Sequence, residues 1–318
     1  MKARTSLGGK FNLNDYVVYI GFAVIFVFFS ITLFNRGFFT GGNLMNITQQ
    51  TTMISVMAIG MTFTLSAGEI DLSIGSVVAI SAMNTALLLR HTSVLVAFLG
   101  GICTGVVVGF INGLFVTRVR IPSFIVTLGM GAIAGGFARL ITNLESVPVD
   151  NDTFNFIFGS GDIGPVSVLF IWTLVLLILG QIVLRKTAFG RYVLATGGNK
   201  VSAIYSGINT NRIKMAVLVL NGALASLAGI LYTGRLHGAR YTLGDADLLL
   251  VIAAVIIGGT SLFGGKGTVI GAIIGSLIMG MINNGLVLMG LNVSLQMIFR
   301  GVIIIASVSL SLREAKER

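Results

Sequence analysis

The sequence predicts an all-α polytopic integral membrane protein with about ten transmembrane helices, both termini in the cytoplasm, and glycine-rich segments that break helices. Hydrophobic residues make up 55% of the 318 positions and charged residues 10%, whereas soluble domains carry about 25% charged residues. Apolar runs of membrane-spanning length recur along the chain, and Lys and Arg gather in alternate connections between them. We expect one transmembrane domain over residues 1–318, with a cytoplasmic loop at residues 185–214.

Ten apolar runs supply the expected spans, most of them near the roughly 17–25 residues that a bilayer requires. Lys2, Arg4 and Lys10 precede the first run, and no small-residue cleavage site follows it, so we expect an uncleaved span with its start inside. The eighth run is short, and we expect its glycine-rich continuation to complete it. The runs are Tyr16–Phe34, Leu44–Ser66, Leu72–Leu89, Val94–Val116, Pro122–Leu140, Val166–Leu184, Met215–Tyr232, Leu248–Leu262, Val269–Leu288 and Leu291–Leu312.

The distribution of basic residues predicts the orientation. With the N-terminus inside, the cytoplasmic connections hold 15 Lys and Arg residues and the external ends hold 5, as the preference of basic residues for the cytoplasmic side requires. The connection at 141–164 carries four acidic residues and no basic residue, which suits an external loop. Because orientation explains the net charge of +10, we expect no nucleic-acid partner.

The stretch from Arg185 to Lys214 is the longest basic interval, with six Lys and Arg residues and no acidic one. Its centre has the signals of a short helix: Asn199 as the N-cap, a turn and a half from Lys200 to Tyr205, and Gly207 as a left-handed exit. Such a compact cytoplasmic knob suits contact with a partner. We expect Arg185 and Lys186 to anchor the end of the sixth span.

Two glycine-rich stretches, residues 66–76 and 262–272, follow comparable spans and are candidates for broken helices. They align at an offset of 196, with Gly68 on Gly264 and Gly75 on Gly271, while Gly265 extends the second stretch. The same offset places spans one to four on spans seven to ten, which suggests two parallel four-helix halves. Main-chain groups freed in such segments must be satisfied inside the protein or beside water.

Glu69 and Asp71 in the first stretch allow two interpretations. Acidic residues at membrane depth are costly and often functional, and Ser66, Ser73 and Ser76 add hydroxyl groups nearby. Alternatively, they lie at the inner boundary of two spans, where they cap a helix or pair with a basic residue. We favour the capping role.

The fourth span has a glycine at every fourth residue from Gly101 to Gly113. This spacing lets two helices touch along their main chains, so we expect helix packing here rather than a surface that lines a ligand. Gly271 and Gly275 repeat the spacing once in the ninth span.

Motifs for catalysis and metal binding fail on inspection. GGTSLFGGKGT resembles a phosphate-binding loop, but Lys266 is followed by Gly267 instead of Ser or Thr, so we expect no ATP bound by this motif. The one cysteine, Cys103, excludes a cysteine-ligated zinc site, and His91 and His237 fall in predicted external loops. We therefore expect no catalytic residue and no metal site.

Amide side chains within the spans are the remaining chemical signal. Carboxamides offer both hydrogen-bond donors and acceptors, which suits a pathway for an uncharged, hydroxyl-rich solute. Hydrogen bonding between helices is the alternative for any single one of them. The candidates for the substrate pathway are Gln49, Gln50, Asn84, Asn283, Asn284 and Gln296.

Five motifs in order carry a family resemblance: GEIDLSIGS at 68–76, GRY at 190–192, TGGNK at 196–200, SGIN at 206–209 and GGTSLFGGKG at 258–267. From about Phe38 to the last span the chain resembles the ribose-type carbohydrate permeases of bacterial ATP-binding-cassette (ABC) importers. Family members commonly have glycine where Glu69 stands and an acidic pair where this chain has Leu248 to Leu250. Asp245 and Asp247 lie just upstream of that position.

The resemblance implies a multi-pass permease of the bacterial inner membrane that pairs with a second permease chain, identical or not, surrounded by membrane lipid. ABC ATPase subunits would bind ATP and Mg²⁺, so this chain would bind no cofactor, and an external solute-binding protein would deliver a sugar. The basic loop is similar to a helix that couples a permease to its ATPase, which assigns that role to Gly198, Asn199, Lys200, Ser206 and Gly207. The structural or gating motif would comprise Gly68, Glu69, Asp71, Ser73, Gly264 and Gly265.

Two alternatives remain at this point. A branched-chain amino-acid permease of the same broad importer class would share the architecture and differ in the solute. An ion-coupled secondary transporter would need a proton or ion relay in the membrane, for which Glu69 and Asp71 are the inner-facing acidic candidates.

Overall fold

The computed structural model describes residues 17–316, so the N-terminal basic residues Lys2, Arg4 and Lys10, and the start of the first predicted span at Tyr16, lie outside the described residues. The helices are α1 (Val17–Thr32), α2 (Gly41–Ser66), α3 (Ile74–Leu89), α4 (Val94–Leu114), α5 (Ser123–Leu140), α6 (Asp152–Asn155), α7 (Val168–Lys186), α8 (Ala188–Gly198), α9 (Lys200–Tyr205), α10 (Thr210–Leu236), α11 (Asp247–Ile257), α12 (Val269–Leu288) and α13 (Val293–Lys316).

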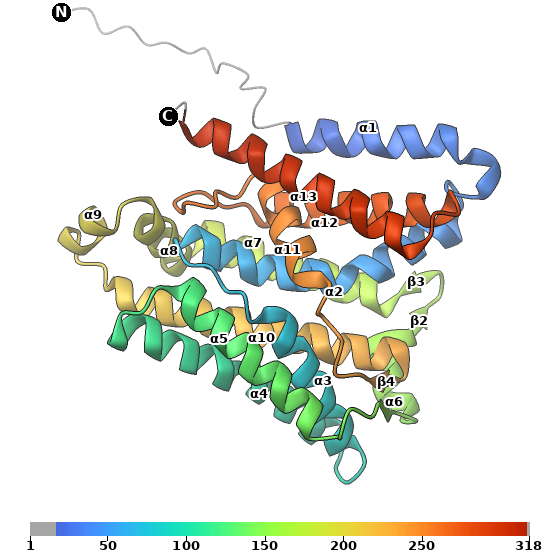
Figure 1. Cartoon of the computed structure of the whole chain (residues 1–318), viewed down its shortest axis with the longest axis horizontal. Helices are drawn as coiled ribbons and strands as arrows, with labels where there is room; N and C mark the ends of the chain where they lie inside the picture. Colours follow the sequence, from blue (N-terminus) through green and yellow to red (C-terminus); the bar gives the residue numbers. More distant parts are fainter. Residues whose placement is uncertain (1–16, 317–318) are drawn as a thin grey trace, which may run out of the picture.

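The long helices lie roughly along one direction, and the short elements gather at the two ends of the bundle (Figure 1). At one end α8 and α9 project beyond the other helices. At the opposite end lie α6 and the antiparallel strand pairs of the described chain, in which β1 (Val147–Pro148) pairs with β4 (Gly238–Ala239) and β2 (Asp162–Ile163) with β3 (Val166–Ser167).

The loops predicted to lie on one side of the membrane are grouped together, while the orientation itself stays a prediction. The predicted external loops after the fifth and seventh spans meet in the β1–β4 pair, so they lie on the same side of the molecule. The predicted cytoplasmic loop carries α8 and α9 at the other end, and α13 runs back towards that side (Figure 1).

A helix occupies each of the ten predicted spans. Within the described chain, five helices are long and apolar enough to cross a membrane by length and composition: α4 with its π-helical end (Phe115–Val119), α5, α7, α10 and α12. The shorter apolar helices include α1, α3, α11 and the first part of α13. The chain is a polytopic helical membrane protein, and the count of ten crossings stays a prediction.

The eighth predicted span needs a correction. It was expected to run to Leu262 and to be completed by the glycine-rich residues that follow. Instead α11 ends at Ile257, where Gly259 takes a positive φ of 85°, and residues 258–268 form a non-helical connection to α12. Two adjacent glycines end the helix because they stabilise it poorly and turn easily.

The glycine stripe of α4 packs against α10, as expected. A Cβ atom added at Gly105 would meet the main chain of Gly222, and one added at Gly109 would meet the main chain of Leu218 and Val219. The two helices therefore approach with main chain against main chain, the geometry that small residues permit. Gly275 of α12 lies in the same way against Ala254 of α11.

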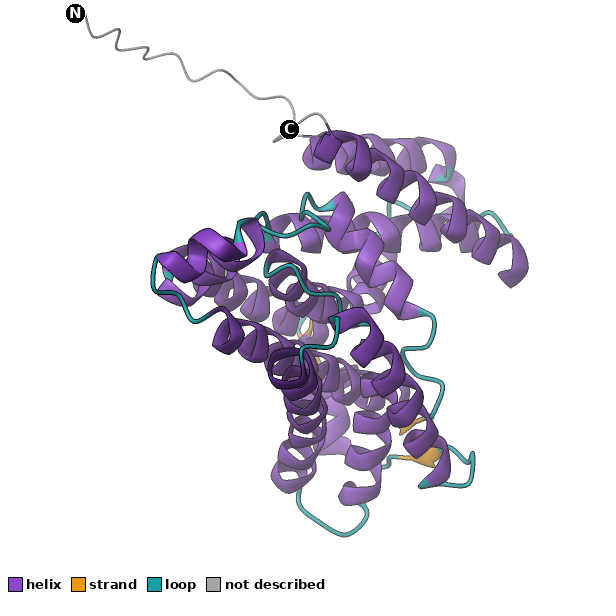
Figure 2. Ribbon diagram, turned by 60° about the vertical axis from the view of Figure 1, so that its left-hand side comes forward, coloured by secondary structure: helices purple, strands orange, loops and turns teal. Residues whose placement is uncertain are grey.

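Helix α2 is the centre of the bundle and is buried at every position from Thr51 to Ser66. It packs against α7, α10, α11 and α12, and in Figure 1 it lies among them. The turned view of Figure 2 shows that most of the described chain is helical. Its buried methionines, Met53, Met57 and Met61, recur at helical spacing within the main apolar cluster. Unbranched Met side chains fill irregular gaps between helices.

The predicted repeat of two parallel halves receives no support from helix packing. Helices α3 and α4 lie side by side along much of their length, but their counterparts at the offset of 196, α12 and α13, touch at few positions. The two glycine-rich connections do occupy comparable places, each between the inner end of one helix and the start of the next.

The α4–α10 contact makes a direct prediction. Gly109→Ala should destabilise the protein by about 1–3 kcal/mol, because the new methyl group overpacks the interface. Melting of the purified protein in detergent measures the effect. Gly136→Ala on α5 is the matched control, since an added Cβ there meets no atom of the described residues within 4 Å. Equal melting of the two variants would contradict the close approach of α4 and α10.

Candidate functional site

The basic loop contains two helices, α8 and α9, separated by the extended main chain of Asn199. The first, α8, is capped by Thr187, whose side chain accepts a hydrogen bond from Gly190 N at 3.2 Å. It was not expected from the sequence, which predicted only the second helix. Val193 and Gly190 of α8 are buried, and Val193 belongs to an apolar cluster with Leu184 of α7 and Ile213 of α10.

The second helix, α9, forms as predicted. Asn199 is its N-cap, and the amide oxygen accepts a hydrogen bond from Ser202 N at 2.9 Å. Gly207 takes the left-handed conformation with φ of 81° and donates to Ile204 O at 2.9 Å. Arg185 and Lys186 lie in the last turn of α7, also as predicted.

The outer face of α9 is apolar and exposed. Tyr205 is 88% exposed, and Val201 and Ile204 are more than half exposed, whereas Ala203 is buried on the opposite face. These side chains sit on the helix that projects from the end of the bundle (Figure 1). An exposed apolar cluster among basic residues, outside the bilayer, is typical of a protein interface.

Both glycine-rich connections converge on the end of α8. Gly265 donates its N–H to Ser66 O at 3.0 Å. A Cβ atom added at Gly197 would lie 2.8 Å from Gly265 N and closer still to Ser66 O, and one added at Gly264 would lie 2.6 Å from Gly197 O. A Cβ atom added at Gly68 would lie 3.6 Å from the Gly197 Cα, an ordinary van der Waals contact. We call this meeting of three main-chain segments the glycine junction.

Positive φ angles show why glycine is required there. Gly68, Gly264 and Gly265 have φ of 77°, 89° and 76°, a region in which residues with a Cβ atom are strained. Gly198 lies against Gly265, so the predicted coupling residue and the predicted gating residue are in contact. The sequence singled out these glycines, but it gave no sign that they meet.

Residues 67–73, which we call the linker segment, connect α2 to α3 without regular structure. Hydroxyl groups of α5 satisfy its main chain. Ile70 N donates to Ser123 Oγ at 3.1 Å, and Leu72 N donates to Thr127 Oγ1 at 2.9 Å. The single hydroxyl proton of Thr127 has two acceptors in reach, Ser123 O of the same helix at 2.8 Å and Ile70 O at 3.2 Å. These bonds provide the internal partners that a broken helix needs at membrane depth.

Asp71 lies in the centre of a buried polar network and is 1% exposed. Its Oδ1 accepts from Ser73 N at 2.9 Å and from Ser73 Oγ at 2.6 Å, and its Oδ2 accepts from Asn221 Nδ2 at 3.0 Å. Asn112 Nδ2 donates to Ser73 Oγ at 3.0 Å. Asp71 therefore ties the start of α3 to α4 and α10. It does not cap α3 as we expected, because no side chain makes a capping hydrogen bond at the start of that helix.

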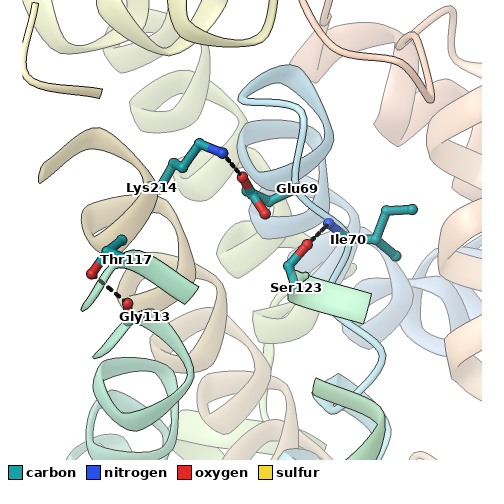
Figure 3. Close-up of polar contacts among 6 residues, drawn as sticks. All are labelled: Glu69, Ile70, Gly113, Thr117, Ser123 and Lys214. Carbon is teal, nitrogen blue, oxygen red and sulfur yellow. Dashed lines mark hydrogen bonds and ion pairs between the residues drawn. The ribbon is translucent and has the colours of Figure 1, made fainter. Parts of the chain in front are cut away.

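Glu69 forms an ion pair with Lys214 of α10 (Figure 3). The glutamate is 4% exposed, and the side chain of Lys214 is 17% exposed. Glu69 thus takes the boundary role by pairing with a basic residue, and not by the helix cap that we favoured. Its partner comes from the end of the same basic loop that was predicted to contact the ATPase.

The amides predicted for a substrate pathway do not form one cluster. Asn84 Nδ2 donates to Thr104 Oγ1 at 2.7 Å between α3 and α4, and Asn284 exchanges hydrogen bonds with Asn43 of α2. Gln296 Nε2 donates to Leu291 O at 2.8 Å, close to the start of its own helix. These bonds are structural contacts of the kind weighed as the alternative.

The other pathway candidates lie on α2 and α12. Gln50 Nε2 donates to Asn46 Oδ1 at 3.1 Å within α2, while Asn283 Oδ1 accepts from Arg300 of α13. Within the described residues Gln49 is only partly buried, so its amide has access to surrounding molecules. Its role in a pathway stays a prediction.

Asp245 and Asp247, which lie just upstream of Leu248 to Leu250, both have side-chain partners. Asp247 Oδ2 accepts from Tyr232 OH at 2.7 Å, and Asp245 lies 3.6 Å from the Arg139 guanidinium. Arg139 also lies over the Tyr241 ring at 5.6 Å. The described residues contain no group of three or more His, Cys, Asp or Glu side chains that could hold a metal ion.

Comparison with known proteins assigns these features to a family. Residues 43–308 match the family described as branched-chain amino acid transport system / permease component. The chain belongs to this permease family. The ribose import permease of Escherichia coli is 39% identical over 282 residues, covering 87% of this chain and 88% of the relative.

Other relatives in the family carry different solute names. The L-arabinose ABC transporter permease of Azospirillum brasilense is 35% identical, with 95% of this chain and 88% of the relative covered. The D-allose transport system permease of Escherichia coli is 36% identical, with 93% and 91% covered. Permease components are not enzymes themselves.

The glycine junction predicts a difference between two glycines of similar conformation. Gly264→Ala should cost roughly 1–2 kcal/mol for the left-handed conformation and more for the contact with Gly197. Gly290→Ala carries the strain alone, because Gly290 has φ of 80° and an added Cβ meets no described atom within 4 Å. Melting of both purified variants measures the difference, and a smaller loss for Gly264→Ala would contradict the close contact.

Proposed function

We propose that this chain is the transmembrane permease of a bacterial ABC importer for a sugar, and that α8 and α9 couple it to an ATPase. The observation that carries the coupling role is the exposed apolar face of α9. This helix directly follows α8, whose Gly197 contacts both glycine-rich connections. Relatives named for ribose, arabinose and allose support a pentose or hexose as the solute.

The complete transporter would contain several other chains. Separate ABC ATPase subunits would bind ATP and Mg²⁺, so the permease itself would bind no cofactor and hydrolyse nothing. A second permease chain would complete the pathway within the inner-membrane lipid. An external solute-binding protein would deliver the sugar to the end of the bundle that carries α6 and the strand pairs.

The coupling residues divide into those that shape α9 and those that contact the partner. Asn199 and Gly207 define the ends of α9, and Gly198 ends α8 against Gly265. Lys200 and Ser206 are exposed and would lie beside the apolar face in the contact. ATP binding would then favour one state of the permease over another through its effect on this contact.

Transport in proteoliposomes tests the assignment. The permease, its cognate ATPase and its binding protein are reconstituted, and uptake of radiolabelled ribose, arabinose and allose is measured with and without ATP. We expect ATP-dependent uptake of at least one sugar. Uptake driven by an ion gradient without the ATPase, or ATP-driven uptake of branched-chain amino acids alone, would overturn the assignment.

The exposed face of α9 predicts a specific loss of ATPase binding. Tyr205→Ala should weaken assembly with the ATPase by about tenfold or more, because truncation of a central aromatic side chain often costs about 2 kcal/mol or more at an interface. Leu144→Ala is the control, since Leu144 is an exposed apolar residue in the predicted external loop. Co-purification measures both, and unchanged assembly of Tyr205→Ala would exclude this face as the contact.

A further inference from the structure

Helix α5 is attached to the bundle differently along its two halves. Within the described structure, the buried residues of its first half are Ser123 and Thr127, while its second half buries Ala134, Gly135 and Ala138. The large apolar side chains of the first half, including Phe124 and Leu128, are exposed. The first half of α5 therefore depends on hydroxyl contacts, which need a partner with fixed main-chain positions.

That partner is the linker segment. Both hydroxyl groups bond the main chain at Ile70 and Leu72, and Figure 3 shows Ser123 pointing at Ile70 from the start of α5. Since Ser123 Oγ and Thr127 Oγ1 both accept from main-chain N–H groups of the linker segment, the position of the segment determines where the first half of α5 lies.

On its other side the linker segment is attached to α10. The carboxylate of Glu69 and the ammonium group of Lys214 point toward each other across the gap between the two elements (Figure 3). The pair is largely shielded from water, so the attraction is stronger than at an exposed surface and is little screened by salt.

Lys214 is connected to α9 through a short segment of chain. Residues 206–209 join α9 to α10, and Asn209 caps α10 by accepting from Arg212 N at 3.1 Å. Lys214 lies in the second turn of that helix. The contacts thus run without interruption from α9 through the start of α10 and the linker segment to α5.

We propose that the linker segment transmits movement of the coupling region to the inner half of α5, with Glu69–Lys214 as its input contact and Ser123 and Thr127 as its output contacts. This inference rests on the proposed coupling function. The four residues are positioning residues: they set the position of α5 and need not touch the solute. The Glu69–Lys214 pair keeps the linker segment attached to α10 when α10 shifts. The hydroxyl groups of Ser123 and Thr127 keep α5 attached to the linker segment.

A double substitution separates transmission from mere folding. Glu69→Gln with Lys214→Met removes both charges and leaves no unpaired buried charge, so the fold should tolerate it. Glu69→Lys with Lys214→Glu restores a pair of reversed polarity. Melting of each purified variant, ATP hydrolysis and sugar uptake by the full reconstituted complex are measured together.

In the neutral variant we expect melting close to wild type, ATP hydrolysis at half the wild-type rate or more, and sugar transported per ATP reduced tenfold or more. The reversed pair should recover at least half of the wild-type ratio. An unchanged ratio in the neutral variant, or a ratio that the reversed pair leaves as low as the neutral variant does, would overturn the proposal. So would a loss of transport that only parallels a loss of folded protein.

A second measurement needs no partner and no solute, so it distinguishes failure of this inference from failure of the proposed function. A spin label is placed at Phe124→Cys in a Cys103→Ser background, and the chain is studied alone in nanodiscs. The control label is at Phe137→Cys, an exposed site on the other half of α5. Neutralising Glu69 and Lys214 should increase label mobility at position 124 and leave position 137 unchanged. Equal spectra at position 124 would overturn the proposal.

Discussion

The glycine junction is the constraint on which the end of this permease that carries α8 and α9 depends. The end of α8 and the two connections that follow α2 and α11 approach so closely that a Cβ atom at Gly197 or Gly264 would meet main chain. Without side chains between them, the three segments form one contact surface with little room for independent movement. The loop predicted to contact an ATPase thereby touches the two places where the membrane helices are interrupted.

A second constraint follows from the interruption of helices at membrane depth. The linker segment is not helical, so its polar groups need other partners. Ser123, Thr127 and the network around Asp71 provide them. Ser123 and Thr127 belong to α5, while Asn112 and Asn221 of the network around Asp71 belong to α4 and α10. The same contacts therefore satisfy these buried polar groups and connect the three helices mechanically.

The sequence predicted local features well because their signals are local. Asn199 and Gly207 marked both ends of α9, and the spacing of Gly101 to Gly113 identified a helix-packing face. It missed α8, because Gly197 and Gly198 and the surrounding basic residues are also typical of a loop, and because its apolar face is short. It extended the eighth span too far, since hydropathy does not register the turn at Gly259. It could not assign partners to Glu69, Asn84 or Asn284, since those partners come from other helices and depend on the packing.

Structures of the assembled transporter without nucleotide and with ATP bound would test the central claim, that the glycine junction and the linker segment connect the ATPase contact to α5. The account predicts that the apolar face of α9 is buried against the ATPase. It also predicts that the linker segment, the start of α10 and the inner half of α5 move together, with the Glu69–Lys214 contact intact in both states. An exposed α9, or a movement of α5 that leaves the linker segment behind, would contradict the account.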